Sequence, residues 1–305
     1  MRTGNISNPI DIASPDALEL LFRKREKAQS ARSYFLGKAQ DIYLAALKRA
    51  ENERLSIIAK QKEDYLKKLQ QDGVANPNLE GFKSITYKEK LGTQAAISTI
   101  QLQPYYPHKS FISPLELKNS IEAIRARGKS WVEFPSLNQE TIPEGVLSFN
   151  WNEENGSIDC EQLYGYGLVY LSKDVLWIED GRPKVYLSHV ARQLFVTLLA
   201  TANFYKHIGY QGNITGYLLI HGVEGAEISR ILAQGWTPHF FENKRFFLNK
   251  YLWDIDIDTS VLNNPKELQE FFIEMIKEIY VGLNCPPIQE DLLKAFLKDE
   301  GWLIE

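Results

Sequence analysis

The sequence contains little cysteine and no long apolar run, and both absences exclude classes of protein. Only Cys160 and Cys285 occur among its 305 residues, which excludes a disulfide framework and fits a reducing compartment such as the cytoplasm. No stretch of 18 apolar residues is present, so no transmembrane helix is expected. The N-terminal residues lack the apolar core of a signal peptide. We therefore expect a cytoplasmic protein with no membrane partner.

The sequence also lacks the local motifs that mark catalytic, phosphate-binding and metal sites. The glycine clusters at 165–167 and 222–225 complete neither a dinucleotide-binding fingerprint nor a P-loop. We interpret the first as a bulge or close approach within a strand, and the second as a turn after a strand. No histidine lies at metal-binding spacing from another histidine or a cysteine; the five are His108, His189, His207, His221 and His239. A cysteine–histidine nucleophile pair has no local support either, so we name no catalytic residue and expect no cofactor.

What is present describes a globular protein with an uneven distribution of charge. The chain is 44% hydrophobic, 24% charged and 12% aromatic, enough for a substantial core in one large or two ordinary domains. Its net charge is −4, yet residues 23–68 hold 13 Lys/Arg against 6 Asp/Glu and so carry +7. Residues 69–305 carry −9. The pattern indicates a basic helical arm joined to an acidic body.

Residues 14–72 are expected to form the helical arm. Ser14 and Pro15 are typical of a helix start, and Asp72 with Gly73 ends the helical pattern. Residues 73–81 then have the composition of a linker. The apolar positions form a broken stripe and a short heptad-like seam, namely Leu18, Leu21, Phe22, Phe35, Ala39, Ile42 and Ala46, then Leu55, Ile58, Tyr65 and Leu69. We expect one long helix, or a helical hairpin broken near 30–37, that self-associates or binds a protein partner in the manner of a coiled coil.

Residues 82–305 are expected to form an α+β domain with a mixed or antiparallel sheet packed on a long central helix. That helix follows Ser188, which we predict as its N-cap, and ends at Gly209, which suits the left-handed C′ position. Its apolar residues occupy two faces: Val190, Leu194, Leu198, Thr201, Tyr205 and Ile208 on one, and Phe195, Leu199 and Ala202 on the other. A helix that is apolar on two sides is covered on two sides.

Further elements are expected around this helix. A capping box at Ser113–Glu116 predicts a helix that continues to Gly128. Asn264-Pro265-Lys266-Glu267 predicts the start of another helix, which Cys285-Pro286-Pro287 separates from the last one; its apolar residues are Leu268, Phe271, Phe272, Met275, Ile276 and Ile279. A last amphipathic helix is expected over 288–298. The predicted strands are 82–103, 131–134, 146–151, 163–171, 175–178, 217–220, 246–248 and 251–257, with a hairpin turn at 172–174.

The basic residues near the start of the arm are the first candidate site. They are Arg23, Lys24, Arg25, Lys27, Arg32 and Lys38. Such side chains can neutralise phosphates, so they favour contact with nucleic acid. The alternative is a solvated helix face, or one docked on the acidic body, because no aromatic or groove-reading motif accompanies the charges.

Three aspartates near the C-terminal end of the sheet region are the second candidate site. Asp254, Asp256 and Asp258 alternate with isoleucines, so on a strand the three carboxylates leave from one face, as a hard cation requires. The alternative is the solvated face of an edge strand, where charges discourage edge pairing. The EF-hand pattern fails, since Thr259 stands where glycine is needed.

The order of elements over 95–260 resembles a known bacterial region. The features are the strand at 97–103, the capped helix, the strands over 163–178, the long helix, the H-I-G-Y-Q-G turn before 217–220, and G-V-E-G. It is similar to the domain found downstream of the AlbA-type, Schlafen-like DNA-binding domain, over about half the chain. The resemblance implies a sensor or scaffold domain of a bacterial regulatory or defence protein. The basic arm stands where that family has its DNA-binding domain, so no contact residue carries over.

Three hypotheses follow from the sequence. The first is a non-enzymatic binding, sensing or scaffold module that oligomerises through its N-terminal helices. The second is a nucleic-acid-binding protein that uses the basic arm. The third is a metal-dependent enzyme that uses the strand with Asp254, Asp256 and Asp258.

Overall fold

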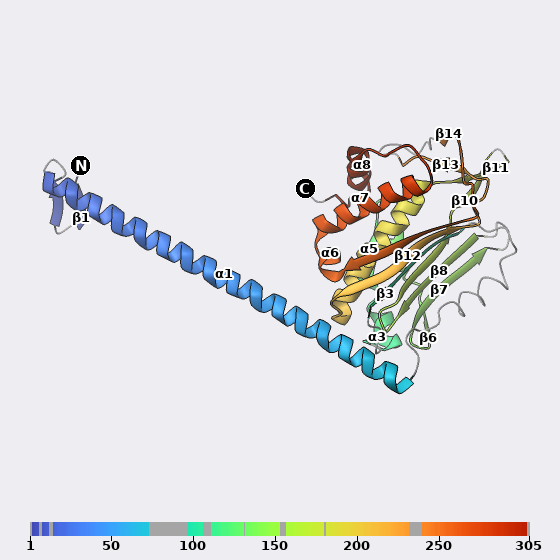
Figure 1. The fold of residues 1–305 in the computed structure, drawn as a ribbon, viewed down its shortest axis with the longest axis horizontal. Coiled ribbons are helices and arrows are strands. Elements are labelled where there is room, and N and C mark those ends of the chain that lie inside the picture. The colour runs from blue at the N-terminus through green and yellow to red at the C-terminus, as the bar shows by residue number, and fades with distance from the viewer. Residues whose placement is uncertain are drawn as a thin grey trace. The chain divides into compact units, whose positions relative to one another are not determined.

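The chain divides into two compact units, Met1–Ile57 and Ile58–Glu305. The computed structural model describes residues 2–5, 8–11, 15–72, 97–105, 111–130, 132–152, 157–179, 181–231 and 240–303 (Figure 1). The predicted linker at 73–81 and the first part of the predicted strand at 82–103 lie outside these ranges. Within them, no helix combines the length and apolar character needed to cross a bilayer.

The first unit contains a short hairpin and most of one long helix. Strands β1 (Arg2–Asn5) and β2 (Asn8–Asp11) pair antiparallel. Helix α1 (Pro15–Asp72) begins and ends where the sequence predicts, and it runs unbroken through 30–37, so the hairpin alternative is wrong. No described side chain of α1 is buried.

A seven-stranded sheet organises the second unit (Figure 1). Its strands, in spatial order, are β15 (Lys250–Asp258), β12 (Asn213–His221), β3 (Ile97–Pro104), β9 (Val169–Asp174), β8 (Ser157–Tyr164), β7 (Gly145–Asn152) and β6 (Glu140–Ile142). Every neighbouring pair is antiparallel, which confirms the α+β class.

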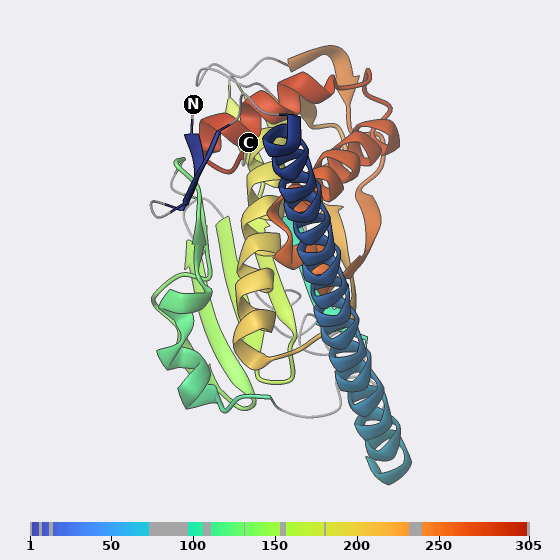
Figure 2. The same ribbon diagram turned by 90° about the vertical axis from the view of Figure 1, so that its left-hand side faces the viewer.

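Helix α5 (Leu187–Ile208) lies against one face of this sheet, as Figure 2 shows in yellow. Cross-strand partners such as Ile100 and Leu171 point to this covered face and join the main core, because paired residues in antiparallel strands share a face. Both predicted apolar faces of α5 are buried or partly buried. Gly209 ends the helix with φ +70°, as expected. The N-cap, however, is Tyr186, and Ser188 lies inside the first turn.

Three C-terminal helices cover the second apolar face of α5. They are α6 (Thr259–Asn263), α7 (Pro265–Gly282) and α8 (Glu290–Glu300). Phe195 of α5 contacts Phe272 and Trp302, with ring centroids 4.9 Å and 4.8 Å away. Asn264 caps α7 by accepting from the Lys266 N–H, so this capping signal was correctly predicted. The C-terminal helices therefore complete the core around α5.

Two smaller sheets complete the second unit. One contains β10 (Leu176–Glu179), β11 (Arg182–Val185), β13 (Glu227–Ser229) and β14 (Phe240–Arg245), and its β11–β13 pair is parallel. The other pairs β4 (Ala126–Arg127) with β5 (Glu133–Phe134). Because β9 and β10 belong to different sheets, the predicted hairpin at 172–174 is wrong.

Three other predicted elements differ from the structure. The helix expected from 113 to 128 is two short helices, α3 (Pro114–Asn119) and α4 (Ile121–Ile124), although the Ser113–Glu116 capping box is present. The single strand expected over 163–171 is a hairpin that turns at 165–168. The strand expected at 246–248 is the connection between β14 and β15, because the hydroxyl of Tyr251 accepts the N–H groups of Phe247 and Leu248.

The ring of His189 on α5 makes the stability of the protein depend on pH. Burial and, to a smaller extent, the Arg192 charge lower its pKa to about 4, although Glu300 opposes both effects. Because this value lies below the ordinary 6.5, the neutral ring stabilises the folded state above pH 6.5, and that stability is lost as the pH falls toward 4. The loss attributable to His189 is about 3 kcal/mol.

Replacing His189 with glutamine should therefore flatten the acid side of the stability curve. We expect urea unfolding at pH 7 and pH 4.5 to show a smaller drop for His189→Gln than for the native chain, by about 2–3 kcal/mol. Equal drops in the two proteins would mean that His189 is not held neutral by its surroundings.

Candidate functional site

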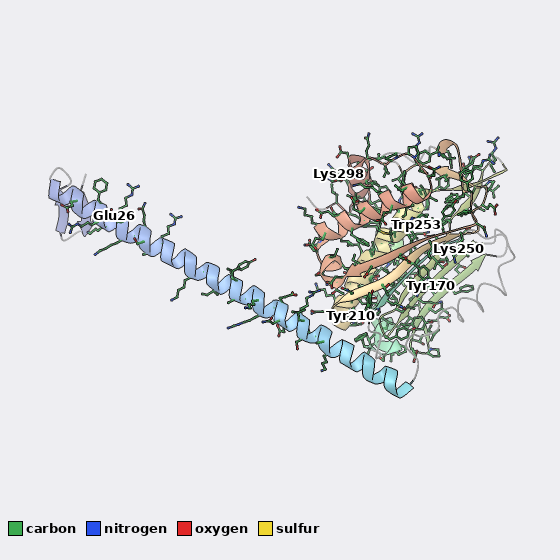
Figure 3. The ribbon with its side chains drawn as sticks, in the orientation of Figure 1. Glu26, Tyr170, Tyr210, Lys250, Trp253 and Lys298 are labelled. Atoms are coloured by element: carbon green, nitrogen blue, oxygen red, sulfur yellow. The ribbon has the colours of Figure 1, made fainter. Side chains whose placement is uncertain are left out.

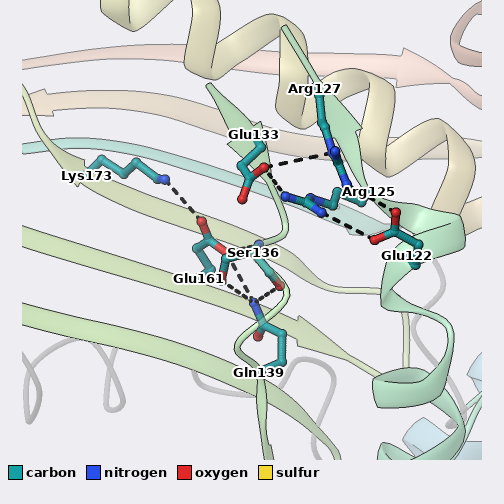
Figure 4. Close-up of polar contacts among 8 residues, drawn as sticks. All are labelled: Glu122, Arg125, Arg127, Glu133, Ser136, Gln139, Glu161 and Lys173. Atoms are coloured by element: carbon teal, nitrogen blue, oxygen red, sulfur yellow. Dashed lines mark hydrogen bonds and ion pairs between the residues drawn. The ribbon is translucent and has the colours of Figure 1, made fainter. Parts of the chain in front are cut away.

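A buried carboxylate, Glu161 of β8, is the centre of the most connected polar cluster among the described residues (Figure 4). Its Oε2 accepts the backbone N–H of Ser136 at 2.6 Å and Nε2 of Gln139 at 3.2 Å. Only 1% of Glu161 is exposed. A buried charge of this kind persists only when it is paired and hydrogen-bonded, so its partners decide what the cluster can do.

Lys173 of β9 supplies the opposite charge. Its Nζ lies 3.1 Å from Oε1 of Glu161 and 3.0 Å from Oδ2 of Asp159. Burial acts to lower the pKa of Lys173, but the two carboxylates outweigh burial and the net shift is upward. Lys173 is therefore an ammonium at neutral pH, and the three side chains together carry a formal charge of −1.

A second ionic network holds the segment that leads into this cluster. Glu133 of β5 pairs with Arg125, and Arg125 and Arg127 each pair with Glu122, at 3.3 Å and 3.1 Å (Figure 4). Only Phe134 and Pro135 separate Glu133 from Ser136 along the chain. The segment 133–139 is therefore fixed at one end by arginines and at the other by Glu161.

Several polar atoms of this cluster, and of Ser98 on the strand next to Lys173, are buried and have no hydrogen-bond partner. They include Oγ of Ser98, Oε1 of Gln139 and Oδ1 of Asp159. Ser98 and Gln139 are 1% and 3% exposed. Unpaired buried polar atoms are rare in folded proteins, and they often mark the position of a water molecule or a ligand.

The sequence did not identify this cluster. Asp159 and Glu161 lie two residues apart, a spacing that places both on one face of a strand, but the predicted strand began only at Leu163. Lys173 reaches them through the β8–β9 register, in which it is the direct partner of Asp159. The alternation of Asp159 and Glu161 with other residues was the one available signal.

The six predicted nucleic-acid contacts are all exposed on α1, whose described side chains stand out from the helix in Figure 3. They do not share a side. At 100° per residue, Arg23, Lys27 and Lys38 fall within a narrow arc, whereas Arg25 and Arg32 fall nearly opposite. Arg23 is in addition paired with Glu19 at 2.7 Å.

The three aspartates of the predicted metal site lie on β15, which is an edge strand among the described residues. Asp254 and Asp256 are exposed while Ile255 and Ile257 are buried, as the edge-strand alternative expects. Asp258 accepts the Ser260 N–H at 2.8 Å and caps α6. Across the part of the chain that the structure describes, no three His, Cys, Asp or Glu residues form a group suited to a metal ion.

Both cysteines are buried and neither forms a disulfide. Burial raises the pKa of Cys285 to about 11, which keeps it a thiol at neutral pH. Cys160 accepts from Nε2 of Gln162 at 3.3 Å, on the face of the sheet opposite α5. Since the thiolate is the reactive form, Cys285 is not poised as a nucleophile.

Comparison with known proteins yields no relative from which a function can be transferred. No protein-family model matches the chain, and neither a curated protein nor a solved structure shows significant similarity to it. The resemblance to the domain downstream of AlbA-type, Schlafen-like domains therefore stays a prediction.

Proposed function

We propose that this protein is a binding or scaffold module that assembles with a second copy of itself through helix α1. The observation that carries the proposal is the exposure of large apolar side chains along that helix. Phe22 is 61% exposed, Leu44 53% and Leu55 52%. A helix gains most of its stability in water from packing an apolar stripe against a neighbour, which a second copy would supply.

These three residues lie on one stripe of the helix, and Ile42, which the sequence pattern grouped with Phe22, does not belong to it. Phe22 and Leu44 are 22 residues apart, and Leu44 and Leu55 are 11 apart. Eleven residues complete close to three turns, so the three side chains align along a nearly straight helix. Full burial of each side chain stabilises the assembly by about 1.5–3 kcal/mol, and a dimer buries two copies of each residue.

The proposal is tested by light scattering on the full chain and on Leu44→Glu. We expect the native chain to have twice the monomer mass, and the variant to dissociate about 100-fold more readily, because each helix loses a buried leucine and gains a carboxylate in the seam. Ile42→Glu is the matched control, because Ile42 is 67% exposed but lies almost opposite Leu44 on the helix. A native monomer, or equal masses for native and Leu44→Glu protein, would refute assembly through this stripe.

A sensing role in a bacterial regulatory or defence protein belongs to the same proposal. Assembly through α1 leaves the second unit to bind a ligand, and the cluster around Glu161 supports a binding role there. Nucleic-acid binding through α1 is a weaker second proposal. It is supported by the six exposed cations, but their distribution over two sides of the helix suits a single phosphate backbone poorly.

A further inference from the structure

Two of the unpaired atoms, Oγ of Ser98 and Oδ1 of Asp159, lie in one row of side chains across three strands. The third, Oε1 of Gln139, lies beside that row, on the side chain that donates to Glu161. Ser98 of β3 is the direct partner of Lys173, and Lys173 is the direct partner of Asp159. Direct partners in antiparallel strands point to the same face, and Glu161, two residues after Asp159, points there as well. Ser98, Lys173, Asp159 and Glu161 therefore share the face of the sheet that α5 covers.

The unpaired atoms of this row, and of Gln139 beside it, are mostly hydrogen-bond acceptors. Oδ1 of Asp159 and Oε1 of Gln139 can only accept, and the hydroxyl of Ser98 can accept or donate. Lys173 already directs its ammonium at both carboxylates. A molecule that completes the row must therefore bring N–H or O–H donors.

The net charge of the row further limits the class of ligand that it can bind. The two carboxylates exceed the one ammonium, so the row attracts a cation and repels an anion. A metal ion does not fit, because the described residues form no group of three His, Cys, Asp or Glu side chains suited to one. Organic cations with several N–H donors satisfy both requirements.

We propose that the row formed by Ser98, Lys173, Asp159 and Glu161, together with Gln139 beside it, binds a small organic cation that carries a primary ammonium or a guanidinium group. The N–H donors of the cation satisfy Oδ1 of Asp159 and Oε1 of Gln139, and its positive charge balances the row. Solvent reaches the row at Asp159, whose side chain is 43% exposed while that of Glu161 is 2% exposed. The inference deepens the proposed function by naming the ligand class of the second unit.

The test uses the full chain with putrescine and agmatine as probes, and sodium chloride at matched ionic strength and succinate as controls. Calorimetric titration is expected to give a dissociation constant on the order of 1 mM for at least one amine. The amine should also raise the melting temperature by a few degrees, since it binds only the folded state. Succinate should do neither.

Two substitutions distinguish amine binding at the row from nonspecific electrostatic attraction to an acidic surface. Asp159→Asn removes one carboxylate charge from the row and should weaken amine binding about tenfold or more, and Ser98→Ala should weaken it a few-fold. Asp254→Asn is the matched control, because it removes an exposed aspartate from the same sheet outside the row. Binding that is absent for both amines, or lost equally in Asp159→Asn and Asp254→Asn, overturns the inference.

The two proposals fail independently. Mass by light scattering tests assembly through α1 without any amine, and calorimetry on Leu44→Glu tests the amine site in the dissociated chain. If Asp159→Asn has the native melting temperature without amine, its loss of binding is assigned to the row and not to unfolding. If Asp159→Asn is already unfolded, Ser98→Ala decides: amine binding as tight as native then overturns the inference.

Discussion

Replacing Phe195 with alanine should lower the free energy of unfolding by about 3–5 kcal/mol, the range typical of a buried phenylalanine. Phe195 is 1% exposed and contacts the rings of Phe272 on α7 and Trp302 beyond α8. Its removal leaves a cavity between α5 and the C-terminal helices that backbone elements on both sides prevent from closing. Urea unfolding followed by tryptophan fluorescence measures the change directly.

The control for this substitution is Lys206→Ala on the same helix. Lys206 is exposed, and alanine favours a helix slightly more than lysine does, so stability should change by less than about 0.5 kcal/mol. A loss below about 1 kcal/mol for Phe195→Ala would mean that the C-terminal helices do not close on α5 as the structure shows.

The sequence predicted α5 well in its packing and poorly at its start. Two apolar faces follow from spacing alone, and the structure covers both. The predicted N-cap, Ser188, is wrong. A different serine satisfies the first backbone N–H of the helix, because Oγ of Ser229 on β13 accepts the Leu187 N–H at 3.0 Å. That partner is distant in sequence, so no local pattern could identify it.

A buried turn caused the largest error in the sheet. The stretch 163–171 is apolar throughout and suggests one buried strand. In the structure, Tyr166 and Leu168 belong to the turn but are buried in a second apolar cluster with Tyr164. Turns are usually exposed, so a buried one has the composition of a strand, and only the positive φ of Gly167 (+101°) distinguishes it.

The candidate site could not be predicted from the sequence for a related reason. Its charged residues come from two strands whose alignment depends on that turn, and Ser98 comes from a third. Spacing along the chain reports neighbours within one strand, but register across strands decides which side chains meet. The Asp254 strand shows the converse, since alternation within a single strand was enough to predict an edge strand.

The ion pair between Lys173 and Glu161 should show a large and non-additive effect on stability. Replacing Lys173 with methionine leaves the buried Glu161 carboxylate without its cation and should cost about 3–5 kcal/mol. Adding Glu161→Gln removes the unpaired charge, while its amide can still accept from Ser136 and keep the 133–139 segment in place. The double variant should therefore be more stable than Lys173→Met alone.

A double-mutant cycle measures this coupling by urea unfolding at neutral pH. Arg182→Met is the control for the loss of a cation at an exposed pair, because Arg182 is 66% exposed beside Glu227, and it should cost less than about 1 kcal/mol. If Lys173→Met and Glu161→Gln add without coupling, the two charges do not depend on each other. The charge excess that the amine site requires would then lose its support from this ion pair, so the cycle also bears on the amine site.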